Sequence, residues 1–247
     1  MSLPLITPDW PAPRTVRAFA TTREGGVSTD AFASLNLGTH VGDDPARVAE
    51  NRARLRRHLP ADPMWLEQVH GIDVAPWREV EGPITADAAF TSAANAVCVV
   101  MTADCLPVLF CDRAGSVVAA AHAGWRGLLA GVLENTLQAM QVPAEHVLAW
   151  YGPAIGPRAF EVGDEVREAF VAADPAHRDA FVAGDTGGKW LADLYGLASQ
   201  RLRAAGVTAI HGGGRCTLNE AATFFSYRRD ARTGRQASLI WLTESVR

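Results

Sequence analysis

Three apolar runs near the middle of the chain constrain its fold most. They cover 96–102, 106–111 and 116–121, and each has the length of one strand. An apolar run of this length, bounded by polar or turn residues, is typical of a strand that is buried on both faces. The sequence therefore predicts a buried sheet inside a layered fold.

Strand-like and helix-like segments alternate along the rest of the chain. Asp44-Pro45 opens a helix, because aspartate caps a helix N-terminus and proline fits the first turn. Apolar spacing predicts further elements: strands at 14–22, 64–69, 147–151 and 207–211, and helices at 45–59, 129–140, 163–172 and 190–204. We also expect 224–228 to pair with 237–242 across the turn at Thr233-Gly234. The pattern predicts the α/β class, with residues 1–247 forming a single-domain layered sandwich.

Composition excludes several classes of protein. Of 247 residues, 48% are hydrophobic, which is sufficient for a sizeable core, and the net charge of −4 argues against a nucleic-acid partner. The first 13 residues lack the features of a signal peptide, and no apolar run is long enough to span a bilayer. We therefore expect a cytoplasmic protein with no membrane partner. The cysteines follow no disulfide spacing and fit a reducing compartment: Cys98, Cys105, Cys111 and Cys216.

Three polar residues stand at the edges of apolar strands: His70, Cys105 and His122. Reactive side chains at such positions are held by rigid backbone and still reach a cleft. Two imidazoles and one thiolate suit Zn²⁺ and leave a fourth position open, as in catalytic zinc sites. Without a metal, the same residues could act as a cysteine nucleophile with a histidine base. Their wide spacing forms no compact metal motif, so the residues alone leave both alternatives open.

Arginines at loop edges form a second candidate group, because a guanidinium can bind phosphate or carboxylate through two parallel hydrogen bonds. Arg23 has the most site-like setting, in the segment Thr22-Arg23-Glu24-Gly25-Gly26. Arg126 follows His122 closely and is adjacent to Trp125, a candidate stacking surface. We expect one or two members of this group to bind an anion; the others are Arg158, Arg228 and Arg229.

Several segments of the chain match a known family. Residues 65–71 (WLEQVHG), 102–108 (TADCLPV) and 122–127 (HAGWRG) resemble the YfiH family, also called the laccase-domain or polyphenol-oxidase-like family. Further matches follow the family order, at 22–28, 34–38, 40–44, 151–156 and 225–230. The resemblance runs from about Arg14 to Leu242, nearly the whole chain, and the number of motifs makes it specific.

The resemblance implies a fold and a site. The family fold is a layered α/β sandwich with mixed β-sheets, similar to some bacterial toxin cysteine hydrolases. The catalytic and metal-binding residues of the family correspond here to His70, Cys105 and His122, with zinc as the expected cofactor and copper as an alternative. Substrate contacts are expected within or beside the matched segments, from Arg23, Asn36, Gln68 and Arg126.

The resemblance also implies an activity: purine nucleoside phosphorylase on adenosine, inosine and methylthioadenosine, with adenosine deaminase activity as well. The expected partners are small molecules, a purine nucleoside and phosphate, and we expect a monomer. Deamination would use a metal-activated water at C6 of adenine, with Asp104 or Glu67 as the proton shuttle. In phosphorolysis, Arg23 or Arg126 would hold phosphate near ribose C1′.

Three other functions are alternatives. Bacterial members of the family are linked to correcting peptidoglycan precursors, and Cys105 with His122 or His70 would then form a cysteine hydrolase that cleaves an amide. A copper-dependent polyphenol oxidase is less favoured. Coupled copper clusters use many histidines in His-x-His pairs, and this chain has seven histidines and no such pair. A metal-binding module without activity fits least, because three ligands leave a coordination position open.

Overall fold

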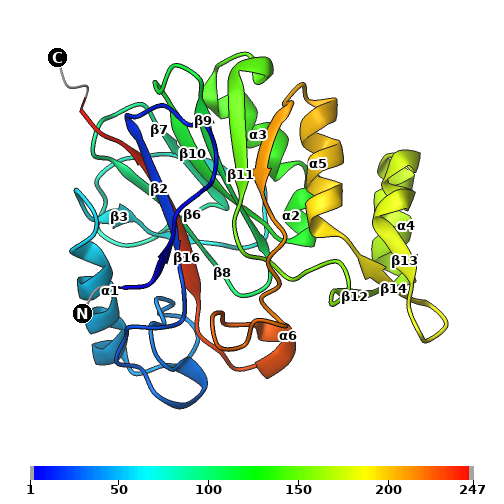
Figure 1. Cartoon of the computed structure of the whole chain (residues 1–247), viewed down its shortest axis with the longest axis horizontal. Coiled ribbons are helices and arrows are strands. Elements are labelled where there is room, and N and C mark those ends of the chain that lie inside the picture. The colour runs from blue at the N-terminus through cyan, green and yellow to red at the C-terminus, as the bar shows by residue number, and fades with distance from the viewer. Residues whose placement is uncertain (1–2, 245–247) are drawn as a thin grey trace.

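Two large β-sheets lie face to face at the centre of the molecule (Figure 1). In this computed structural model, which describes residues 3–244, one sheet has the strand order β1 (Leu5–Ile6), β2 (Val16–Thr21), β16 (Gln236–Leu242), β8 (Val97–Thr102) and β3 (Pro63–Met64). The other sheet has the order β15 (Ala209–Gly212), β11 (Val147–Tyr151), β9 (Leu106–Asp112), β10 (Val118–Ala123), β7 (Ala88–Thr91) and β5 (Val74–Pro76). Both sheets mix parallel and antiparallel pairs.

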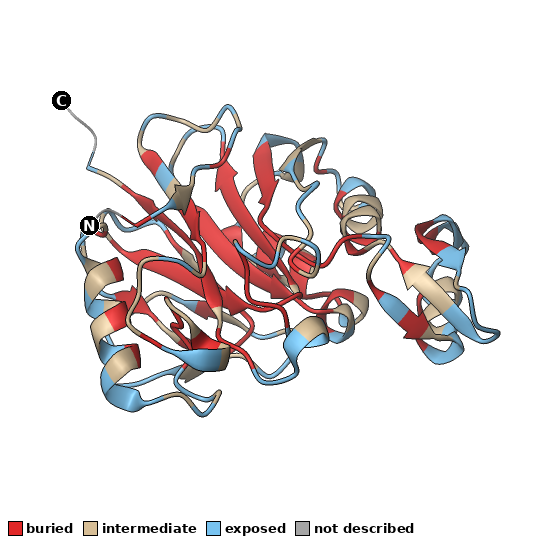
Figure 2. Ribbon diagram, turned by 60° about the horizontal axis from the view of Figure 1, so that its bottom comes forward, coloured by how far each residue is buried: buried red, intermediate tan, exposed pale blue. Residues whose placement is uncertain are grey.

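Helices cover the outer face of each sheet. Helix α1 (Pro45–Arg56) packs on the first sheet through Leu55. The second sheet is covered by α2 (Trp125–Ala130), α3 (Val132–Met140) and α5 (Leu194–Ala204). Figure 2 shows the consequence: the central strands are almost wholly buried, and the helices are exposed on one side. The expected layered α/β fold with mixed sheets is confirmed.

The apolar runs are continuous because both faces of their strands are covered. In β9, Leu106, Val108 and Phe110 pack toward the helices, whereas Leu109 and Cys111 pack between the two sheets. All five side chains are fully buried. Burial of each large apolar side chain contributes about 1.5–3 kcal/mol, so the layers are held together mainly by these strands.

A smaller lobe and short elements complete the fold. A three-stranded sheet has the order β12 (Glu161–Gly163), β14 (Lys189–Ala192) and β13 (Phe181–Ala183), and it carries α4 (Asp164–Ala173) at one side of the molecule (Figure 1). A two-stranded sheet joins β4 (Leu66–Glu67) to β6 (Ile84–Thr85), and α6 (Tyr227–Asp230) is a single turn. Three 3-10 turns cover Asp30–Phe32, Ala144–His146 and Pro175–Ala180.

Several predicted elements differ from those observed. The helix predicted at 129–140 is two helices, because Gly131 adopts a φ of +107° and ends the first one. The strand predicted at 64–69 is divided between β3 and β4, and the start of the helix predicted at 190–204 is strand β14. The pairing of 224–228 with 237–242 is wrong: β16 pairs with β2 and β8, while Tyr227 begins α6. The helix start at Asp44 is confirmed, since its side chain accepts a hydrogen bond from the Ala46 N–H.

Two expectations concern the ends of the chain and the membrane. The predicted domain of 1–247 includes 1–2 and 245–247, which lie outside the described residues. Between residues 3 and 244, none of the helices is both long enough and apolar enough to cross a bilayer.

Candidate active site

The ends of two central strands in the second sheet, together with one turn, bring the three predicted residues together. His122 belongs to β10, and Cys105 directly precedes β9; these antiparallel neighbours place Ala123 opposite Leu106. His70 enters from the turn after β4, where its φ is +60°. Strand pairing therefore fixes Cys105 beside the end of β10, and the turn adds the second imidazole.

The three side chains are close enough to act as one centre. Their ligand atoms all lie within 4.8 Å of one another. His70 Nε2 is 3.7 Å from Cys105 Sγ, and the imidazole rings of His70 and His122 meet edge to face with 4.8 Å between centroids. A Cβ on Gly124 would lie 2.7 Å from His70 Cδ2 and 3.0 Å from Cys105 Sγ, so any larger residue there would displace these side chains. The expected convergence of the three residues is present.

Asp87, just before β7, is a part of the centre that the sequence did not reveal. Its carboxylate is fully buried and lies 2.8 Å from His122 Nδ1. The same carboxylate accepts the backbone N–H groups of Val69 at 3.1 Å, His70 at 3.0 Å and Gly71 at 2.6 Å. One side chain thus orients both histidines. The only sequence signal is a lone acid among alanines at the start of a buried strand.

Burial and hydrogen bonding oppose each other in this cluster. Burial acts to raise the pKa of Cys105, but His122 and His70 lower it to about 6. Burial acts to lower the pKa of His122, whereas Cys105 and Asp87 raise it to about 9. Burial also acts to raise the pKa of Asp87, and hydrogen bonds from His122 and the backbone bring it below its usual value. In the metal-free chain these directions favour a thiolate beside an imidazolium that Asp87 holds.

Alkylation should report this low thiol pKa. In metal-free protein we expect the reaction of Cys105 with iodoacetamide to accelerate between roughly pH 5 and 7 and then level off, because the thiolate is fully formed above its pKa. Cys111 should stay unreactive, since burial raises its pKa to about 12. Peptide mapping by mass spectrometry measures each rate, and a Cys105→Ala variant identifies the fast site. A rate still rising steeply between pH 8 and 9 would contradict the assignment.

The centre opens into a cavity of about 460 Å³. Besides the three central residues, its walls include aromatic side chains at Trp125 and Phe160 and guanidinium groups at Arg126, Arg228 and Arg235. Arg126 stacks on Trp125 with its Cζ 4.5 Å from the ring centroid. Such a combination of apolar surface with a few polar groups is usual for small-molecule sites.

The structure brings two of the four predicted substrate residues to this cavity. Gln68 and Arg126 line it. The Gln68 amide donates to the Met101 carbonyl and accepts the Met101 N–H, both at 2.8 Å, so it fixes the cavity wall. Arg23 and Asn36 are not among the lining residues, so the structure does not bring them to the cavity around Cys105.

Structural hydrogen bonds explain both exceptions. Arg23 donates to the carbonyls of Ala33 at 2.8 Å and Ala221 at 3.0 Å, and its guanidinium lies over Phe225. Asn36 is fully buried, and its side chain bonds within the loop that contains Gly38. Both residues use their polar groups to hold loops.

The other predicted polar residues also have specific places. Asp104 accepts from Thr217 Oγ1 and from the Arg228 N–H, both at 2.6 Å, so both carboxylate oxygens are engaged and a proton shuttle there is disfavoured. Glu67 is exposed, accepts from Thr85 and lines a neighbouring cavity instead. Arg158 is exposed, and Arg229 binds Asp230 and nearby carbonyls; neither lines the cavity around Cys105.

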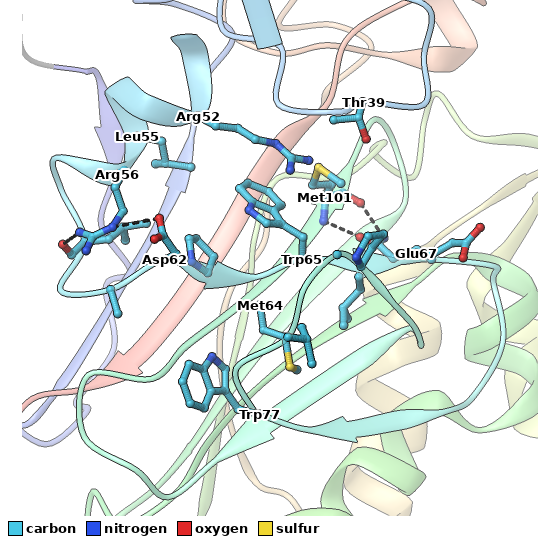
Figure 3. A pocket seen from close by; sticks show the side chains of 18 of the residues that line it. Thr39, Arg52, Leu55, Arg56, Asp62, Met64, Trp65, Glu67, Trp77 and Met101 are labelled. Carbon is cyan, nitrogen blue, oxygen red and sulfur yellow. Dashed lines mark hydrogen bonds and ion pairs between the residues drawn. The ribbon is translucent and has the colours of Figure 1, made fainter. Parts of the chain in front are cut away.

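The neighbouring cavity is larger, about 1240 Å³, and lies between α1 and the strands β3 and β4 (Figure 3). Its wall shares His40, Leu66, Gln68 and Met101 with the cavity around Cys105. Arg52 projects from α1 over the Trp65 ring, with 3.7 Å between its Cζ and the ring centroid (Figure 3). The shared wall therefore has a guanidinium on each side: Arg52 in the larger cavity and Arg235 in the cavity around Cys105.

The donor set around Cys105 fits a divalent metal. The residues that would hold it are His70, Cys105 and His122, a thiolate and two imidazoles, which are common ligands of zinc and of copper. His122 gives Nδ1 to Asp87 and leaves Nε2 for the metal. A carboxylate behind a ligating histidine is the usual second layer of such centres. Fold and centre together define a mixed α/β protein with a metal-capable His-Cys-His centre.

Comparison with known proteins identifies the family. Residues 17–243 match the family described as multi-copper polyphenol oxidoreductase laccase. The chain is 58% identical over 239 residues to a purine nucleoside phosphorylase of Pseudomonas aeruginosa, with 97% of this chain and 98% of that protein covered. It is 58% identical over 241 residues to the purine nucleoside phosphorylase YfiH of Escherichia coli, with 96% and 98% covered. The chain belongs to the YfiH family.

Solved structures agree with this family and with the fold. A Neisseria meningitidis protein of the DUF152 family superposes with a TM-score of 0.92 at 52% identity, covering 97% of this chain and 99% of that chain. YlmD from Geobacillus stearothermophilus gives a TM-score of 0.84 at 31% identity, covering 98% and 100%. This chain therefore shares its mixed α/β architecture with both of these proteins.

Proposed function

We propose that this chain is a purine nucleoside phosphorylase that acts on adenosine, inosine and methylthioadenosine, and that it also deaminates adenosine. The observation that carries the proposal is the convergence of His70, Cys105 and His122 in a cavity of about 460 Å³. That volume is in the range of sites for small organic ligands. Relatives at 58% identity bear the name purine nucleoside phosphorylase, which favours this activity over others that the centre could support.

The chain supplies aromatic and cationic groups side by side in one cavity, with Arg126 over Trp125 and Arg228 over Phe160. Trp125 and Phe160 line the cavity and give aromatic surface for a purine. Arg126, Arg228 and Arg235 give positive charge for phosphate. When the bond between ribose C1′ and the base breaks, the sugar becomes positive, so a phosphate held beside C1′ lowers the barrier.

We propose zinc as the metal of this centre and copper as an alternative occupant. A metal there supplies Lewis acidity at neutral pH. Cys105 contributes the thiolate, His70 and His122 the imidazoles, and Asp87 keeps His122 in one orientation. These ligands come from one chain, which supports a monomer as the active unit.

Metal removal tests this assignment. A chelator is expected to abolish adenosine deamination, and added zinc is expected to restore it, because the three ligands alone supply no Lewis acid. Inosine formation measures the activity, and metal analysis confirms removal. Full activity in metal-free protein would instead favour Cys105 as a nucleophile.

A single incubation tests the proposed function itself. Adenosine and phosphate are supplied together, and adenine, inosine and ribose 1-phosphate are detected separately. Adenine formed together with ribose 1-phosphate supports phosphorolysis, and inosine supports deamination. Absence of all three products would overturn the proposal.

A second candidate is a cysteine hydrolase that edits peptidoglycan precursors. The arrangement resembles a hydrolase triad: Cys105 would be the nucleophile, His122 its base and Asp87 the carboxylate that orients the base. This arrangement favours the hydrolase when no metal is bound. The fold similarity to bacterial toxin cysteine hydrolases, which the family resemblance implies, is part of this second proposal. An acyl group trapped on Cys105, without nucleoside turnover, would support it.

Copper-dependent polyphenol oxidation is proposed only as a side reaction. Across residues 3–244, one group of three or more His, Cys, Asp or Glu residues is able to hold a metal, and its members are His70, Cys105 and His122. A single group of this kind is too small for a coupled copper cluster.

We further propose that residues 1–247 form one catalytic domain that works in the cytoplasm on small molecules. The free cysteines support a reducing compartment.

A further inference from the structure

Arg235 is a cation in the catalytic cavity without an acidic partner. It is half-buried and lines the cavity together with Cys105. Within the described part of the chain, no aspartate or glutamate lies within ion-pair distance of its guanidinium. Only Nη1 is engaged, donating to the carbonyls of Thr233 at 3.2 Å and Gly234 at 3.0 Å. A partly desolvated cation of this kind is stabilised when an anion binds.

The loop that contains Asn36 holds Arg235 in place. The Arg235 backbone N–H donates to Asn36 Oδ1 at 2.9 Å, and the same oxygen accepts the Gly38 N–H at 3.0 Å. Asn36 Nδ2 donates to the Gly38 carbonyl and to Asp43 Oδ2. A Cβ on Gly38 would lie 2.9 Å from Arg235 Cγ, so the arginine stem lies directly against that glycine. The 34–38 motif therefore fixes the position of Arg235 in the cavity wall.

The electrostatic environment agrees with this geometry. Burial lowers the pKa of Arg235, while the negative groups of Cys105, Asp104 and Tyr227 act to raise it. Burial also lowers the pKa of His40 on the shared wall, with Arg235 and Arg52 adding to the effect. An arginine stays charged under these conditions, so the wall near Arg235 and Arg52 carries positive charge.

We propose that Arg235 binds the phosphate co-substrate, the role that the sequence had assigned to Arg23. This proposal rests on the proposed phosphorylase function. In the reaction, a phosphate oxygen forms a bond to ribose C1′ as the bond from C1′ to the purine nitrogen breaks. The bonding pair goes to the purine, and the proton that phosphate loses ends on the purine. Arg235 holds phosphate through charge-assisted hydrogen bonds that Asn36 and Gly38 position.

The test compares Arg235→Gln, Arg235→Lys and Gly38→Ala with the unaltered protein. Arg235→Gln is expected to raise the KM for inorganic phosphate by roughly tenfold to a hundredfold, with the KM for adenosine changed by less than about twofold. Arg235→Lys should recover part of the lost phosphate affinity, because lysine keeps the positive charge but cannot form two parallel hydrogen bonds. Gly38→Ala should also raise the KM for phosphate, since it displaces the stem but removes no polar group. Titration calorimetry with phosphate alone gives a readout independent of turnover.

Arg232→Gln is the matched control, because Arg232 is exposed, stacks on Phe32 and lies outside the cavity lining, three positions earlier in the chain. It should leave phosphate binding unchanged. Unaltered protein that forms no ribose 1-phosphate would overturn the phosphorylase function, and calorimetry would then decide whether Arg235 binds phosphate. Normal phosphorolysis with an unchanged KM for phosphate in Arg235→Gln would overturn the inference alone. If that variant fails to fold, Gly38→Ala decides the outcome in its place.

Discussion

Replacing Cys105 with alanine is expected to lower kcat/KM for both adenosine phosphorolysis and deamination by about a thousandfold or more. The change removes the sulfur from a centre whose ligand atoms all lie within 4.8 Å of one another. The backbone pairing of β9 with β10 begins at the next residue, Leu106, so the fold should persist. Adenine and inosine formation measure activity, while metal content per chain and thermal unfolding are recorded on the same samples.

Cys98→Ala is the matched control for that experiment. Cys98 lies in β8, is fully buried, and burial raises the pKa of its thiol far above the usual range. Its loss should cost about 1 kcal/mol of stability through a small cavity and leave turnover unchanged. If the Cys105 variant kept most of its activity, or the Cys98 variant lost it, the assignment of the centre would be wrong.

The buried strands could be predicted because burial of both strand faces makes nearly every residue apolar. Runs such as 106–111 are covered on both faces, so nearly every position is apolar. The same reasoning failed at Phe224 and Phe225, which are equally buried but belong to a loop. There the Phe225 N–H donates to Gln236 Oε1, a side-chain contact that no local pattern specifies. Apolar residues report burial and do not by themselves report strand pairing.

The central residues of the site could be predicted because reactive side chains stand inside the segments that match the family. His70, Cys105 and His122 carry reactive groups at strand edges, and the structure brings them together. Asp87 could not be found in this way, since its partners at 69–71 and at His122 are remote in sequence. Arg23 is a different case: its glycine-rich surroundings suggested a ligand loop, and in the structure its guanidinium donates to two carbonyls outside the cavity around Cys105.

Asp87→Asn is expected to weaken metal binding by about ten- to a hundredfold and to lower turnover by at least about a hundredfold. Asp87 Oδ1 faces His122 Nδ1 and accepts the His70 N–H, while Oδ2 accepts the N–H groups of Val69 and Gly71. An amide has one acceptor oxygen, and its NH₂ group would confront an N–H donor of the turn or of His122. Metal dissociation constants and initial rates of adenine formation measure the two effects.

Asp112→Asn separates this role from a general need for buried carboxylates. Asp112 is also buried and accepts the backbone N–H groups of Ser116 at 2.7 Å and Val117 at 3.1 Å, in the turn that joins β9 to β10. Both variants leave backbone donors poorly satisfied, so both should lower the temperature of thermal unfolding. Only the Asp87 variant should lose metal, because of these two carboxylates only Asp87 contacts a histidine of the proposed metal centre. Equal loss of metal in the two variants would mean that Asp87 acts through stability and not through the orientation of His122.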